Sequence, residues 1–174
     1  SLSYANSQST WTLDRRAEVG LLSHNIAIRG IMGTGHPEFG GHVMIMRAPC
    51  CGNGLGGAGR FSGVEFDHLG QKMALGRYPI HWHMQQNQGF GQYLACCSIH
   101  DSFNRAVVIH GSEGIAVEGN VISKHVGHGV FLEDGSERFN SFYYNLAMGT
   151  TRPPSTPVNE ALIPSDNSHY DIRN

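Results

Sequence analysis

Histidine is the residue type in this sequence with the clearest capacity for chemistry. The chain carries 11 histidines among 174 residues, and ten of them lie between residues 24 and 128. Imidazole titrates near neutral pH and is a common metal ligand, so this density can indicate a catalytic or metal-binding site. It would equally suit a solenoid that stacks polar rows from coil to coil.

Three short segments, residues 78–84, 105–110 and 129–133, alternate apolar and polar side chains. Successive side chains of a strand point to opposite faces, so the apolar face of each segment can pack inward while the polar face points outward. As neighbouring parallel strands about 4.8 Å apart, the segments would stack their outward residues into columns. One outer column would hold His83, His110 and Glu133, with His81 in the column beside it.

This outer column predicts a metal site. Two imidazoles one rung apart can reach the same ion at about 2.1 Å, and a longer glutamate can lean in from the third rung. We therefore predict that His83, His110 and Glu133 bind a divalent metal. Mixed histidine and carboxylate ligands suit zinc, manganese or iron better than calcium, which prefers oxygen alone. The alternative is a histidine stack that is hydrogen-bonded along the solenoid axis.

A second polar column follows from the segment at residues 98–100, where Ile99 is expected to face inward. The outward residues of this column and of the turn after it are Asp67, His100, Ser123, His68, Asp101, Lys124 and His125. Together the two columns would make an outer wall dense in histidine and carboxylate.

The elements that must position these residues are short strands, because helical periodicity is weak throughout the chain. Residues 98–112 align with residues 121–135, which places Ile99 over Ile122 and Ile109 over Leu132 at a separation of 23 residues. A period in the twenties made of short strands is typical of a β-solenoid. We predict an all-β, right-handed parallel β-helix of the pectate-lyase-like type, with these four residues facing inward.

Turns between the strands are rich in glycine, which accounts for 23 residues. Asn120 and Asn145 recur at one predicted corner, where stacked side chains can hydrogen-bond along the axis. The rival fold is an antiparallel sandwich, but Asn-Gly and Asp-Gly hairpin signals are scarce, with Asp134-Gly135 the one fair candidate. Phe66 and Trp82 are 16 residues apart, whereas the corresponding inward residues of the two aligned copies are 10 apart, which predicts an insertion after Leu69.

The predicted organisation is a polar lead at residues 1–14, β-helix coils at 15–149 and a Pro-rich loop at 150–174 that leads to a missing next coil or cap. An open end coil presents unpaired backbone groups that template association. We therefore expect flanking domains or neighbouring chains to cap the coils, and residues 1–174 alone to associate or be poorly soluble.

Composition excludes several classes of partner. Twelve basic residues stand against 14 acidic ones without a basic cluster, so no nucleic-acid partner is expected. No apolar run approaches the roughly 20 residues of a spanning helix, which argues against direct membrane insertion. The glycines of residues 54–59 lack the Lys-Ser/Thr of a phosphate loop, so we expect no nucleotide cofactor.

The four cysteines form two adjacent pairs, and three interpretations stay open. They could be small buried residues, a disulfide could join the pairs, or, least favoured by the spacing, they could bind zinc. The two pairs are Cys50-Cys51 and Cys96-Cys97.

Eight motifs occur in order between about residue 14 and residue 166: AEVGLLSHNI (17–26), FGGH (39–42), FDHLGQ (66–71), YPIHWH (78–83), SIHDSFNR (98–105), HG (110–111), GHGVFLEDG (127–135) and LIPSD (162–166). They resemble the β-helix region of the family of the cell-migration-inducing, hyaluronan-binding protein and its transmembrane hyaluronidase relative, with fibrocystin-like proteins more distant. The chain departs in its shortness, in the Gly-rich insert at 51–59 and in its end at 169–174.

The resemblance implies an extracellular or cell-surface domain with an acidic polysaccharide, hyaluronan-like, as its partner. Some members depolymerise hyaluronan and depend on calcium, so calcium joins zinc and manganese as a candidate ion. If the domain cleaves, His83 or His110 would be the general acid or base. The predicted substrate contacts are Arg77, Arg105, His81 and Asp101. Either arginine could instead pair with Asp101 or Glu133.

The competing hypothesis is a non-catalytic structural module of a large extracellular or ciliary-surface protein, as the fibrocystin-like relatives suggest. The outer histidine wall separates the two hypotheses. An enzyme needs this wall open in a groove, whereas a scaffold would cover it.

Overall fold

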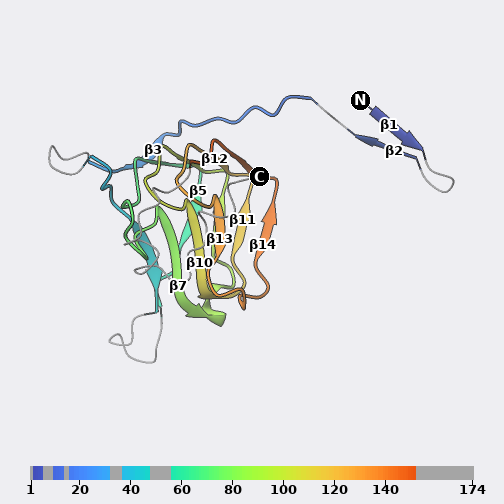
Figure 1. Ribbon diagram of the computed structural model, residues 1–174. Coiled ribbons are helices and arrows are strands. Elements are labelled where there is room, and N and C mark those ends of the chain that lie inside the picture. Colours follow the sequence, from blue (N-terminus) through green and yellow to red (C-terminus); the bar gives the residue numbers. More distant parts are fainter. Residues whose placement is uncertain (1, 6–9, 14–15, 32–36, 48–55, 152–174) are drawn as a thin grey trace, which may run out of the picture.

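The computed structural model describes residues 2–5, 10–13, 16–31, 37–47 and 56–151. Short strands stack into three parallel sheets, and the chain visits each sheet once per coil (Figure 1). Sheet 1 contains β3 (Ile26–Arg29), β6 (Val64–Asp67), β9 (Ser98–His100), β12 (Val121–Ser123) and β15 (Leu146–Met148). Sheet 2 contains β4 (Val43–Met46), β7 (Ile80–Gln86), β10 (Val107–Ser112) and β13 (Val130–Leu132). Sheet 3 contains β5 (Arg60–Ser62), β8 (Tyr93–Ala95), β11 (Ala116–Glu118) and β14 (Ser141–Tyr143).

The strand register confirms the predicted parallel β-helix. Ile99 of β9 pairs with Ile122 of β12, and Ile109 of β10 pairs with Leu132 of β13, both in parallel strands. Parallel pairing between β10 and β13 excludes the antiparallel sandwich. The one helical element among the described residues is the short 3-10 helix η1 (Asn87–Gly89) between β7 and β8.

The core runs along the inside of the coils. Ile99, Ile109 and Ile122 are fully buried, and Leu132, on the last sheet 2 strand, is partly buried against the same cluster. Burying such a side chain removes apolar surface from water and stabilises the fold by roughly 1.5–3 kcal/mol. Trp82 lies in this core and donates its indole N–H to Gln92 Oε1 at 2.8 Å, so its polar atom is satisfied.

The asparagine corner also behaves as predicted. Asn120 Nδ2 donates to Asn145 Oδ1 at 2.9 Å, and Cys97 N donates to Asn120 Oδ1 at 2.9 Å. Asn120 is almost completely buried, so these bonds satisfy polar atoms that water cannot reach. The ladder therefore links three successive coils along the solenoid axis.

The segment at residues 94–99 is not one continuous strand. The chain breaks into β8 and β9 because Cys96 adopts a left-handed conformation with φ 51°, which lets both Leu94 and Ile99 face inward. Cys96 is exposed, Cys97 is buried, and both are free thiols. Cys50 and Cys51 lie outside the described residues.

The N-terminal region contains more structure than a polar lead. Strands β1 (Leu2–Ala5) and β2 (Thr10–Leu13) form an antiparallel hairpin. The chain then crosses the sheet 1 coils, where Ser98 Oγ bonds to Leu22 O and His24 N donates to Glu65 Oε2 at 3.3 Å. At the other end, Thr151 bridges to Val126, and the later residues lie outside the description.

The predicted insertion after Leu69 is present as the long connection from β6 to β7. Within it, Gln71 N donates to Arg77 O at 2.9 Å, which closes residues 71–77 into a compact loop. Asn104 Nδ2, from the next coil, donates to Gln71 O and Ala74 O at 2.9 and 3.0 Å. These bonds hold the loop in place, and its Gly76 carbonyl contacts the outward-facing His81 of sheet 2.

Candidate metal and saccharide site

The outer column predicted from sequence is present on sheet 2. His110 of β10 pairs with His83 of β7, and Val108 pairs with His81, so the two histidine columns lie side by side. Glu133 follows β13 directly, one coil further on. These side chains border a pocket of about 310 Å³ that we call the His pocket, lined by Met44, Leu75, Gly76, Arg77, His81, His83, His110 and Glu133.

His81 is the most buried of the pocket histidines, with 1% of its surface exposed. Its Nδ1 lies 3.1 Å from the Gly76 carbonyl oxygen, which can only accept, so Nδ1 carries the proton and Nε2 keeps a lone pair. Burial lowers the pKa of His81 to about 3, which keeps the ring neutral. A buried neutral imidazole with a fixed tautomer is suited to coordinate a metal ion.

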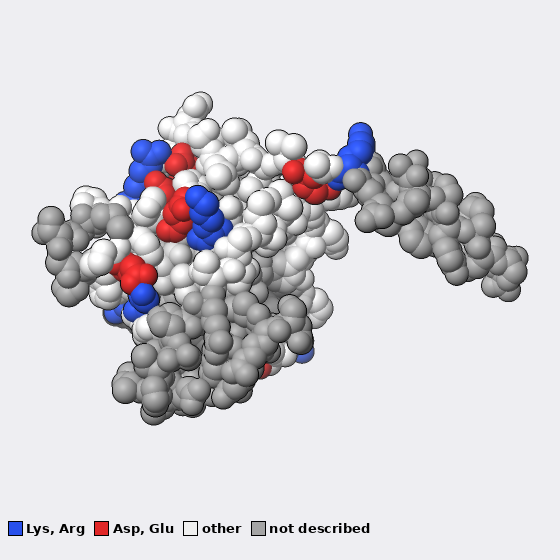
Figure 2. Space-filling model, turned by 45° about the horizontal axis from the view of Figure 1, so that its top comes forward, with Lys and Arg blue, Asp and Glu red and all other residues white. Residues whose placement is uncertain are grey.

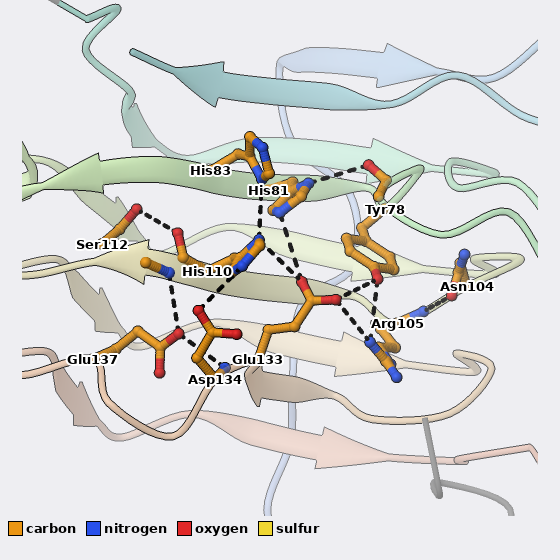
Figure 3. A network of polar contacts seen from close by, with 12 residues as sticks. Tyr78, His81, His83, Asn104, Arg105, His110, Ser112, Glu133, Asp134 and Glu137 are labelled. Atoms are coloured by element: carbon orange, nitrogen blue, oxygen red, sulfur yellow. Dashed lines mark hydrogen bonds and ion pairs between the residues drawn. The ribbon is translucent and has the colours of Figure 1, made fainter. Parts of the chain in front are cut away.

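His83 and His110 approach each other through the same ring atom, with 3.1 Å between their Nδ1 atoms. The opposite nitrogen of His110, Nε2, lies 3.1 Å from Asp134 Oδ2 (Figure 3). Because an ionised carboxylate can only accept a hydrogen bond, Nε2 of His110 donates its N–H to Asp134, which leaves the lone pair on the Nδ1 atom that approaches His83. Burial and the neighbouring His110 lower the pKa of His83.

Glu133 lies beside the histidines, and Tyr78 and Arg105 fix its carboxylate on the side away from them. Its Oε2 lies 3.6 Å from His110 Nδ1 and 3.9 Å from His81 Nε2. Tyr78 donates its hydroxyl to Glu133 Oε1 at 3.3 Å, and Arg105 Nη1 lies 3.8 Å from the same oxygen. Burial raises the pKa of Tyr78 to about 12, so the hydroxyl stays a donor.

The three pocket histidines have the geometry of a possible metal site. One nitrogen from each of His81, His83 and His110 lies within 4.8 Å of the other two. Ligands bound to one tetrahedral ion at about 2.1 Å are about 3.4 Å apart. The 3.1 Å between the Nδ1 atoms of His83 and His110 is close to that value.

Five of the predicted site residues lie together in the His pocket: Arg77, His81, His83, His110 and Glu133. Arg77 is exposed, and its Nη1 lies 3.0 Å from His42 Nε2. Arg105 is 2% exposed and donates to the Tyr78 hydroxyl at 3.1 Å, with its guanidinium 4.0 Å from the Phe131 ring centre. This burial points Arg105 toward the alternative role of pairing with Glu133.

Asp101 lies apart from the His pocket, in the turn after β9. With Asp67 and His100 it forms a second group whose donor atoms lie within 4.8 Å of one another. Its carboxylates already face cations, since Lys124 Nζ lies 3.4 Å from Asp101 and Arg29 Nε lies 3.5 Å from Asp67. Figure 2 shows such mixing on the face in view, where acidic and basic side chains lie next to one another.

Sequence reasoning missed four contributors to the site, namely Tyr78, Met44, Gly76 and Asp134 as a partner of His110. Strand alternation could have revealed Met44, because β4 pairs with β7 in a parallel register that places Met44 beside His81. The contacts of Tyr78 and Gly76 depend on the path of the inserted loop, which carries no periodic signal.

One family profile and three relatives show which known proteins the chain is similar to. The profile described as CEMIP beta-helix matches residues 38–172. A G8 domain-containing protein of Dictyostelium discoideum is 40% identical over 132 residues, covering 75% of this chain and 8% of that protein. Human fibrocystin-L is 36% identical over 87% of this chain and 4% of its own length. A cell surface hyaluronidase of Danio rerio is 35% identical over 88% of this chain and 11% of its own length.

Two facts follow from these matches. The chain is similar both to a cell surface hyaluronidase and to fibrocystin-L, at 35% and 36% identity, as the resemblance in the sequence implied. The chain spans about a tenth or less of the length of these relatives.

Among the described residues, no helix has the length and apolar character needed to cross a bilayer.

Proposed function

Because the chain belongs to the CEMIP beta-helix family, we propose that it is an extracellular or cell-surface β-helix domain that binds an acidic, hyaluronan-like polysaccharide at the His pocket and depolymerises it. The observation that carries the proposal is the meeting of exposed Arg77 with two partly exposed histidines in one pocket. Arginine matches a carboxylate in both charge and geometry. The name of the Danio rerio relative, a cell surface hyaluronidase, supports the choice of polymer and location.

Each pocket residue has a role in this proposal. Arg77 binds a sugar carboxylate at the pocket rim, and His83 or His110 moves a proton at the glycosidic bond, because imidazole serves as acid or base near neutral pH. The alternative use of the same residues is metal binding, in which His83, His110 and Glu133 hold a divalent ion and a histidine bound to that ion no longer moves the proton. The ion would supply positive charge that a neutral imidazole cannot. Arg105 positions Glu133 from behind and does not touch the polymer.

Binding and chain shortening of the purified domain test the proposal, with hyaluronan as the acidic polymer and dextran as the neutral one. We expect binding to hyaluronan alone, and a loss of about tenfold or more in affinity for Arg77→Gln, because a charged hydrogen bond is removed. Arg138→Gln is the matched control, since Arg138 is exposed and outside the pocket. Equal binding of dextran, or unchanged affinity in Arg77→Gln, would refute the proposal.

A non-catalytic structural module is the second candidate. It is favoured by the covering of His81, which is 1% exposed beneath the loop carrying Gly76, and by the similarity to fibrocystin-L. Under this reading the polar groups of sheet 2 stabilise the coils and hyaluronan keeps its length. Unchanged hyaluronan size after long incubation with metal-loaded protein would favour this module over the enzyme.

A further inference from the structure

We propose that His81, His83 and His110 form a three-imidazole site for a borderline transition metal of the zinc type, with Glu133 beside the open coordination position. The inference rests on the proposed function and deepens it, because it names the class of ion and makes His81 a ligand, where the sequence suggested a substrate contact.

The buried nitrogen of His81 carries the argument. Among the described residues, His81 Nε2 is buried and has no hydrogen-bond partner, while Nδ1 is engaged by the Gly76 carbonyl. Leaving a buried polar group of this kind without a partner destabilises the fold. Nε2 lies 3.9 Å from Glu133 Oε2, and one ring nitrogen of His81 lies within 4.8 Å of a nitrogen of His83 and of His110. A metal ion bound there would satisfy all three.

Two of the three histidines have the outer partner that metal-binding imidazoles usually have. A ligating histidine generally donates its other ring N–H to a backbone carbonyl or a carboxylate, which fixes the ring and raises its basicity. His81 donates to the Gly76 carbonyl, and His110 Nε2 faces Asp134 Oδ2. Gly76 belongs to the inserted loop and Asp134 follows β13, so different parts of the chain aim the two ligands.

Donor chemistry selects the class of ion. Three neutral imidazoles suit zinc and its neighbours, whereas calcium takes six to eight oxygen ligands. Three histidines with a fourth position left open is also the arrangement of catalytic zinc sites. Glu133 Oε2 lies 3.6 Å from His110 Nδ1, where it can accept a proton from a molecule in that position.

The group of Asp67, His100 and Asp101 is the rival site on the same protein. It offers more carboxylate oxygen, and its two aspartates are already paired with Arg29 and Lys124. A titration must therefore separate the two groups by substitution.

The test is a metal titration of the EDTA-stripped domain with zinc, cobalt(II) and calcium, in which calorimetry measures affinity and visible absorption reports cobalt geometry. We expect one equivalent of zinc, intense tetrahedral cobalt bands, and no competition by calcium. His83→Asn should weaken zinc binding by about 100-fold or more, and Asp134→Asn by about 10- to 100-fold. His100→Asn is the matched control and should bind zinc as the unmodified domain does. His81→Gln tests the third ligand and should also weaken zinc binding. Because His81 is buried, this variant can fail to fold, and in that case His83→Asn still tests the site.

Calcium binding without zinc binding, undiminished zinc affinity in His83→Asn, or loss of zinc in His100→Asn would overturn the inference. The titration contains no saccharide, so its failure differs from failure of the proposed function. Hyaluronan binding by the metal-free domain would support the proposed function and leave the outcome of the titration unchanged.

Discussion

Arg105 has its side chain buried behind the pocket, although it was predicted to contact the substrate. Its side chain is 2% exposed and that of its partner Glu133 is 9% exposed. The pair therefore lies in a region where two charges attract strongly but are costly to separate. The guanidinium also contacts the rings of Tyr78 and Phe131, so Arg105 acts as a support behind the pocket.

Replacing Arg105 with Met should lower the free energy of unfolding by about 3–5 kcal/mol, because Glu133 would be left as a buried charge without its main partner. Urea denaturation monitored by circular dichroism measures the change. Arg138→Met is the matched control: its side chain is 71% exposed in a pair with Glu113, and such pairs contribute about 0–1 kcal/mol. Similar losses in the two variants would contradict the buried pair.

Buried histidines make the stability of the domain depend on pH, and His125 lies outside the His pocket. Its Nδ1 contacts the Gly127 carbonyl at 3.0 Å, and burial lowers its pKa below the usual 6.5. The unfolded chain therefore takes up the proton first as the pH falls. The stability contributed by the neutral ring is fully present above pH 6.5 and is lost as the pH falls toward the folded pKa.

The unfolding free energy should thus decline below about pH 6.5, with His125 contributing at most about 1.4 kcal/mol per pH unit. The measurement is a series of urea denaturations between about pH 8 and about pH 5. His125→Gln should make the unfolding free energy decline less steeply below about pH 6.5 and should leave its pH dependence above that value unchanged. An unchanged slope in this variant would show that the ring is not held neutral by burial.

At the scale of elements, the inserted loop at residues 71–77 determines how two residues of the His pocket on sheet 2 are placed. It supplies Gly76 to orient His81, and it carries Arg77 to the pocket rim. The loop owes its position to Asn104, whose side chain bonds to two of its carbonyls from the next coil. Pocket geometry therefore depends on a residue that does not line the pocket.

Asn104→Ala should free this loop while leaving the coils paired. We expect faster amide exchange at residues 71–77, a loss of about 1 kcal/mol in unfolding free energy, and weaker hyaluronan binding. Hydrogen exchange followed by mass spectrometry measures the first effect. Asn140→Ala is the matched control, because Asn140 makes similar corner bonds to Ile115 and Ser112 but does not contact the loop. Equal exchange changes in both variants would argue against the proposed role of Asn104.

Strand alternation predicted the outward columns of sheet 2, because a repeating inward isoleucine or valine fixes the face of its neighbours. It could not predict that His81 and Arg105 are buried, since their cover comes from the inserted loop, Tyr78 and Phe131, which follow no period. It also missed the break at Cys96, where a left-handed residue that is not glycine or asparagine gives no turn signal. The hairpin β1–β2 pairs by local contacts outside the repeat.

At the scale of the whole molecule, the last coil presents aromatic surface. Among the described strands, β13, β14 and β15 are the edge strands at this end of the three parallel sheets, as β4, β5 and β3 are at the other end. Tyr143 and Tyr144 are 58% and 94% exposed there, and Phe139 is 70% exposed. An edge of this kind accepts strands from another chain or domain. We therefore propose that a flanking domain or a neighbouring chain caps the last coil at this aromatic surface.

The domain expressed as residues 1–174 should associate with rising concentration, because pairing at β14 and β15 would cover these aromatic side chains. Sedimentation velocity over a range of concentrations measures this. Tyr143→Lys should reduce the association, since a charge at an edge strand opposes pairing. Leu75→Lys, an equally exposed apolar site on the inserted loop, is the control and should not. A monomer at every concentration would show that the last coil is already covered.

Anomalous scattering from crystals of the domain grown with zinc shows whether the outer face of sheet 2 binds a metal ion. We expect one strong peak at the zinc edge, about 2.1 Å from the nitrogens of His81, His83 and His110. A peak at Asp67, His100 and Asp101 instead, or no peak between the three histidines at full zinc loading, would contradict it.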